Sequence, residues 1–150
     1  MTFGEVIDGI GKNLGMELTD EGGAAAVQVD GTPVILQMAD NDLLMMHADI
    51  GEIAPGNRER VLSAAMEANF LYQGTGGATL AVDPRSGHLY IQKYNWLGRL
   101  DVEKAVEGLT RFADMVALWK GLVAETRAVT PPTAGDSYSP MPADGGFMHV

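Results

Sequence analysis

The chain has 150 residues, a length that supports one domain with its own core, and a formal net charge of −10 from 20 acidic and 10 basic side chains. It contains no cysteine, which excludes disulfides, thiolate nucleophiles and cysteine zinc sites. The acidic charge argues against nucleic-acid binding. No apolar run is long enough to span a membrane, and no secretory signal opens the sequence, so we expect a cytoplasmic protein.

A helix is predicted at the start of the chain. Thr2 and Glu5 have the spacing of a capping box, in which each side chain satisfies the free amide of the other residue. The apolar residues behind them recur at helical spacing, and Gly15 is a suitable residue to end the helix. This apolar stripe consists of Phe3, Val6, Ile7, Ile10 and Leu14.

Three strands are expected next. Apolar residues at 24–29 and 33–39 flank Asp30-Gly31-Thr32, which is a hairpin signal, and residues 43–50 follow a further turn. The third strand is apolar on both faces, since side chains alternate along a strand. One face carries Leu43, Met45 and His47, and the other carries Leu44, Met46 and Ala48. Because three helices are few for both faces, we expect a partner chain to provide part of the cover.

A second helix is predicted after Pro55-Gly56. Asn57 is suited to its N-cap position, where a side-chain oxygen accepts from a free amide of the first turn. The glycine-rich segment 74–77 is expected to break the helix. Its apolar face is formed by Leu62, Ala65, Met66 and Phe70, bordered by Val61.

A hairpin and a long helix complete the pattern. Residues 78–83 and 88–96 predict two strands joined by a tight turn, where Asp83 is better explained by an Asx turn than by acid catalysis. Asp101 is the expected N-cap of the last helix, which runs to about residue 127. Its apolar stripe consists of Val102, Ala105, Val106, Leu109, Phe112, Ala113, Val116, Trp119 and Val123.

The order of elements, α-β-β-β-α-β-β-α, predicts the α+β class, with an antiparallel sheet packed by helices. We expect one domain over residues 1–128. Residues 129–150 are rich in proline and glycine and predict a flexible tail, although Phe147, Met148 and Val150 are apolar enough to dock on a surface.

No set of catalytic residues is recognisable. The three histidines, His47, His88 and His149, share no metal-ligand spacing. The segment Gly9-Ile10-Gly11-Lys12 lacks the upstream glycine and the following Ser or Thr of a phosphate loop. We therefore expect a protein that is not an enzyme and that carries no metal or cofactor.

Two stretches resemble the class I type III secretion chaperones, the Tir chaperone family. The first is Gly77 to Ile91, which is similar to the late hairpin of that family and is followed by the helix start Leu100-Asp101. The second is Leu43-Leu44-Met45-Met46, which leads to Ile50-Gly51 and the second helix. The resemblance covers about residues 1–125 and adds Leu109, Phe112 and Trp119 at the family's apolar positions.

The resemblance implies a homodimer that binds the unfolded N-terminal segment of a secreted effector protein and keeps it soluble and competent for secretion. The effector-binding residues that it implies, on the first helix and the sheet, are Val6, Ile10, Leu14, Val34, Leu36, Met45 and Ile91. The dimer-interface residues that it implies are Leu62, Met66, Phe70, Leu80 and Val82. For each of these residues, a place in the core of its own chain is the alternative.

Two other functions stay open at this point. The first is a chaperone-like regulatory domain that binds a folded protein partner. The second is a domain that binds a small molecule at a site the residues do not reveal.

Overall fold

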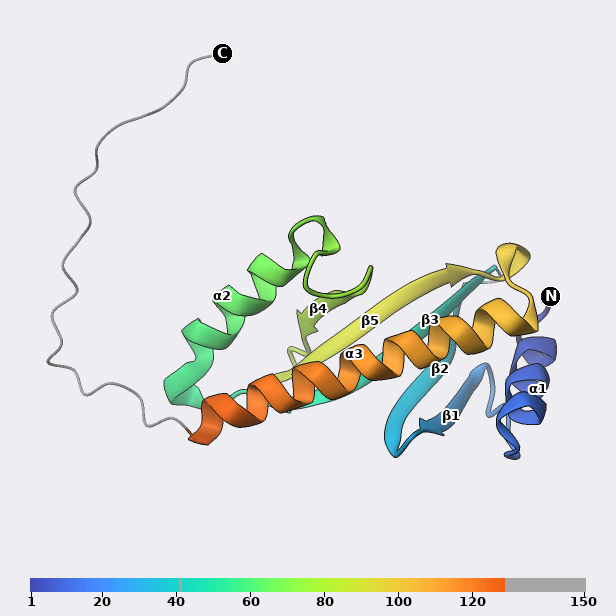
Figure 1. The fold of residues 1–150 in the computed structure, drawn as a ribbon, viewed down its shortest axis with the longest axis horizontal. Coiled ribbons are helices and arrows are strands. Elements are labelled where there is room, and N and C mark those ends of the chain that lie inside the picture. The colour runs from blue at the N-terminus through green and yellow to red at the C-terminus, as the bar shows by residue number, and fades with distance from the viewer. Residues whose placement is uncertain (41, 129–150) are drawn as a thin grey trace, which may run out of the picture.

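The computed structural model describes residues 1–40 and 42–128, with side chains up to residue 126, and the predicted tail of residues 129–150 lies outside this part. The predicted order of elements and the α+β class are confirmed (Figure 1). The helices are α1 (Phe3–Leu14), α2 (Arg58–Asn69) and α3 (Val102–Ala128). The strands are β1 (Ala24–Val29), β2 (Thr32–Asp40), β3 (Leu43–Glu52), β4 (Thr79–Val82) and β5 (His88–Trp96). They form one antiparallel sheet in the order β1-β2-β3-β5-β4.

The core lies between one face of this sheet and α3. Burial alternates along β1 and β3, and the same face is buried on each neighbouring strand. The helix α3 lies lengthwise over the sheet, in much the same direction as β3 in the view of Figure 1, and spans about 40 Å at 1.5 Å per residue. The buried face of the sheet consists of Ala25, Val27, Val29, Val34, Leu36, Leu44, Met46, Ala48, Ile50, Leu80, Leu89 and Ile91.

The helix α1 closes one end of this core. Thr2 and Glu5 form the predicted capping box, and Gly15 ends the helix in the left-handed conformation at φ 68°. Gly9 allows α1 to approach α3 closely, because a methyl group at this position would lie 2.4 Å from Cγ2 of Val102. Gly9 therefore weakens α1 in isolation relative to alanine, but the packing of α1 against α3 requires it.

The helix α2 differs from the prediction in two respects. Asn57 occupies the N-cap position, but its side chain makes no capping bond and instead donates Nδ2–H to the carbonyl of Thr126 near the end of α3. The predicted apolar face is also divided, because Val61 and Ala65 are buried whereas Met66 is exposed. The reason is that α2 packs against β4 and turns its Val61 side toward the groove that it forms with α3, whereas Met66 lies outside that groove.

Asn69 attaches the end of α2 to the short edge strand β4. Its Oδ1 accepts from the Leu80 amide at 2.8 Å, and its Nδ2 donates to the Leu80 carbonyl at 3.0 Å. A single amide side chain thus satisfies both backbone groups of one strand residue, as another strand would.

We expect Asn69→Ala to lower the free energy of unfolding by about 1–3 kcal/mol, because it leaves both backbone groups of Leu80 without their partners. Urea denaturation followed by circular dichroism measures the change. Asn13→Ala, at an exposed position on α1, is the matched control and should shift stability by no more than about 0.5 kcal/mol. Equal effects of the two substitutions would contradict the structural role of Asn69.

Candidate binding surfaces

The face of the sheet that points away from α3 is rich in apolar and aromatic side chains. We call it the outer face, and its residues are Ile35, Gln37, Leu43, Met45, His47, Tyr90, Gln92, Tyr94 and Trp96. The register places Met45 opposite Tyr94 and Leu43 opposite Trp96. Tyr94 and Trp96 are 52% and 56% exposed, which is unusual for side chains of this size. Such a patch on a folded domain marks a surface for another molecule.

His47 lies in the middle of the outer face. Its Nε2 is 3.1 Å from Oε1 of Gln37 on β2, and its ring lies 6.4 Å from that of Tyr90 on β5. Burial by these neighbours lowers the pKa of His47 below its ordinary value of 6.5, because a charged imidazole loses hydration there. The neutral form of His47 is therefore favoured at neutral pH.

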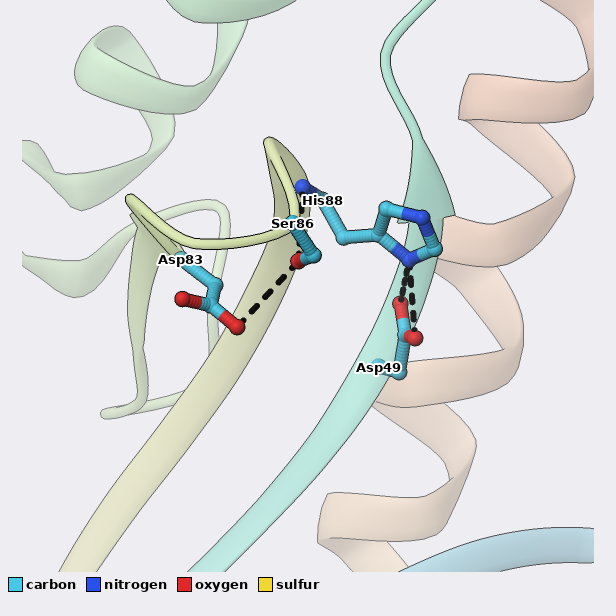
Figure 2. A network of polar contacts seen from close by, with 4 residues as sticks. All are labelled: Asp49, Asp83, Ser86 and His88. Atoms are coloured by element: carbon cyan, nitrogen blue, oxygen red, sulfur yellow. Dashed lines mark hydrogen bonds and ion pairs between the residues drawn. The ribbon is translucent and has the colours of Figure 1, made fainter.

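A polar cluster borders the outer face at the β4–β5 turn (Figure 2). Nδ1 of His88 lies 2.9 Å from Oδ2 of Asp49, an ion pair that joins β5 to β3 when the imidazole is protonated. Asp83 accepts from the Arg85 amide and from the Ser86 hydroxyl, which confirms the Asx turn. The Arg85 amide, followed by the Ser86 hydroxyl, holds the pKa of Asp83 below its usual range. The cluster thus stabilises the turn.

The structure places the predicted effector-binding residues in two groups. Five of them have at most 1% exposure and pack in the core: Val6, Ile10, Val34, Leu36 and Ile91. Leu14 at the end of α1 is half-buried, and Met45 is half-buried on the outer face. Of the seven residues, only these two offer appreciable surface to another molecule.

A second apolar surface lies where α2 ends. The helix is followed by a single 3₁₀ turn, Phe70–Tyr72, in which Leu71 and Tyr72 have φ angles of 52° and 56°. This left-handed conformation costs about 1–2 kcal/mol for each such residue. We call Met66, Phe70, Leu71 and Tyr72 the aromatic knuckle, and their exposed fractions lie between 55% and 70%. Large apolar side chains held in a strained, exposed turn indicate a contact surface.

The predicted dimer-interface residues are also divided by the structure. Met66 and Phe70 are exposed in the aromatic knuckle. Leu62 and Val82 are partly buried against the core, and Leu80 is buried within it. The knuckle brings Met66 and Phe70 together with Leu71 and Tyr72, which the sequence reasoning did not select because no residue pattern predicts a left-handed turn at a leucine and a tyrosine.

Tyr94 and Trp96 are also not among the residues that the sequence predicted for binding, although their alternation along residues 88–96 is visible in the sequence. Alternation shows that two side chains share a face but not whether a helix covers that face. Among the residues that the structure describes, no group of three or more His, Asp or Glu side chains is arranged to hold a metal ion. In the same part of the chain, no helix has the length and apolar character of a membrane span.

Comparison with solved structures shows a shared fold. A chain in the structure of the Yersinia pestis type III secretion chaperone SycH with a stable fragment of YscM2 superposes with a TM-score of 0.63 at 21% identity, over 79% of this chain and 99% of that chain. A chain of the HopA1–SchA chaperone–effector complex gives a TM-score of 0.61 at 18% identity, over 82% and 93%. A chain of the ExsC–ExsE complex superposes with a TM-score of 0.61 at 18% identity, over 79% of this chain and 90% of that chain.

No curated protein matches the sequence. The model of the Tir chaperone protein (CesT) family, however, matches residues 5–119, which include most of α1, the complete sheet, α2 and two thirds of α3. The match spans most of the described domain and agrees with the resemblance of its late hairpin. The chain belongs to the Tir chaperone protein (CesT) family.

Proposed function

We propose that this protein is a type III secretion chaperone that acts as a homodimer in the cytoplasm, binds the unfolded N-terminal segment of a secreted effector on its outer face, and keeps that segment soluble and competent for secretion. Membership of the Tir chaperone family supports this function, and the related fold of the HopA1–SchA chaperone–effector complex is consistent with it. The observation that carries the proposal is the exposed pair Tyr94 and Trp96 beside Leu43 and Met45.

The outer face suits an extended segment. Apolar side chains that project from one side of an extended chain can lie across the row formed by Met45 and Tyr94 and the row formed by Leu43 and Trp96. Aromatic residues of this size bury about 150–250 Å² each when covered. That gain must exceed the entropy lost on ordering the segment, so binding requires several such contacts along its length. Binding of this kind needs neither a cofactor nor catalysis.

The aromatic knuckle suits a second copy of the chain. A twofold interface joins the same patch of both subunits, so Met66 and Phe70 of one protomer would face their counterparts. The knuckle lies on α2 and the turn after it, whereas the outer face lies on β2, β3 and β5 (Figure 1). Dimerisation and effector binding therefore use different residues.

We expect Tyr94→Ala to weaken binding of the effector segment by at least tenfold, because truncation of an aromatic anchor costs about 2 kcal/mol or more. The probe is the N-terminal segment of a secreted effector that co-purifies with this chain in stoichiometric amount, and isothermal titration calorimetry measures its affinity. Leu118→Ala is the matched control, because Leu118 is 53% exposed but lies on α3. A loss of affinity in the control as large as that in the Tyr94 variant would contradict a site on the outer face.

Binding of the same segment should weaken at acidic pH, once the pH falls below the already lowered pKa of His47 in the free chain. A segment that covers His47 lowers its pKa further than its neighbours already do, so binding is strongest where the imidazole is neutral and is lost as the pH falls through the lowered pKa. Titrations at pH 7.5, 6.5 and 5.5 measure the dependence. His47→Gln should flatten the pH dependence, and an identical dependence in the parent protein and the variant would exclude His47 as its cause.

We expect the double variant Met66→Glu, Phe70→Glu to be monomeric, because dimerisation would bury like charges at the twofold axis. Light scattering coupled to size-exclusion chromatography should show half the mass of the parent protein. Since both side chains are about two-thirds exposed or more, the fold should persist, which circular dichroism checks. Leu118→Glu is the control for an added surface charge. A monomeric parent protein, or a dimer that survives the double substitution, would contradict the proposal.

A further inference from the structure

A groove between α2 and α3 lies outside both surfaces described above. Its cavity volume is about 260 Å³, and its floor is apolar. The lining side chains include Val61 and Ala64 of α2 and Trp119, Leu122 and Val123 of α3. Leu122 is 41% exposed at its edge, so the groove leaves apolar surface in contact with solvent.

The walls of the groove are held in place by two hydrogen bonds between distant parts of the chain. Asn57 Nδ2–H donates to the Thr126 carbonyl and ties the start of α2 to the end of α3. The indole Nε1–H of Trp119 donates to the Gly74 carbonyl at 3.0 Å, which fixes the ring that forms part of the wall. A groove built in this way is present before any ligand arrives, so binding of an occupant costs little reorganisation energy.

The nearest unassigned chain is the segment after α3. The helix ends at Ala128, two residues beyond Thr126 on the rim of the groove. Within residues 129–150, Phe147 and Met148 are the one pair of adjacent large apolar residues, and no lysine or arginine occurs. Asp144, three residues before Phe147, is opposite in charge to Arg60 on the α2 side of the groove. Glu125, which has the same charge as Asp144, lies on the α3 side.

The connecting segment is long enough to bring this pair back. Residues 129–146 can extend about 60 Å, whereas the stretch from Trp119 to Ala128 occupies only about 14 Å of helix. Because the ligand is part of the same chain, its effective concentration at the groove is of the order of millimolar, and a weak contact is enough to hold it. We propose that Phe147 and Met148 occupy the α2–α3 groove of their own chain.

Disulfide trapping tests this proposal in the full chain, whose lack of cysteine makes two-cysteine variants unambiguous. The test variant carries Ala64→Cys in the groove and His149→Cys beside the proposed ligand. The control variant carries Ala124→Cys with His149→Cys. Ala124 is exposed, does not line the groove and lies four residues before the end of α3. A tail without a preferred site would reach the thiol of the control variant at position 124 at least as fast as the thiol of the test variant at position 64.

Oxidation with glutathione disulfide should close the disulfide of the test variant at least ten times faster than that of the control variant, with the product running as a monomer on a non-reducing gel. Adding Phe147→Ser to the test variant should reduce its rate to that of the control. Equal rates in the two variants, or a crosslinked dimer in place of the monomer, would overturn the proposal. No effector is present in the experiment, so its outcome is independent of the proposed chaperone function.

Discussion

The burial of one sheet face under α3 is the constraint on which the rest of the structure depends. The sheet has five strands, and α3 supplies the apolar stripe, including Leu109, Phe112 and Val116, that covers its central strands. The helix α1 and the start of α2 complete the cover at its two ends (Figure 1). One layer of helices can cover only one face of a sheet, so the outer face of the described domain stays accessible.

This asymmetry explains why β3 is apolar on both sides. Leu44 and Met46 serve the core, whereas Leu43 and Met45 belong to the outer face. A soluble monomer would carry polar residues at the latter positions, as antiparallel sheets with one solvated face usually do. Their retention, next to Tyr94 and Trp96, makes physical sense if the outer face is covered by another polypeptide during function. The negative charge of the chain then maintains solubility while that surface is free.

The helix α2 shows how one element can serve several surfaces. Its Val61 side contributes to the core and to the α2–α3 groove, its end is attached to β4 through Asn69, and Met66 projects from its far side into the aromatic knuckle. Two polar side chains, Asn57 and Asn69, hold it in this position by bonding to backbone groups of α3 and β4. The positive φ angles of Leu71 and Tyr72 follow from the same arrangement, because the chain must turn sharply from α2 into the edge strand.

Local signals in the sequence were sufficient for the elements themselves. The capping box of Thr2 and Glu5, the Asp30-Gly31 hairpin and the Asp101 N-cap depend on residues within a few positions of one another, so the α+β order and the family resemblance could be predicted without tertiary contacts. Which side of each element is covered could not be predicted in this way. Val34 and Ile91 lie in the core, whereas Tyr94 is exposed, because α3, whose stripe begins near residue 102, decides which sheet face is buried. Periodicity shows which side chains share a face, but only long-range packing determines whether that face meets protein or water.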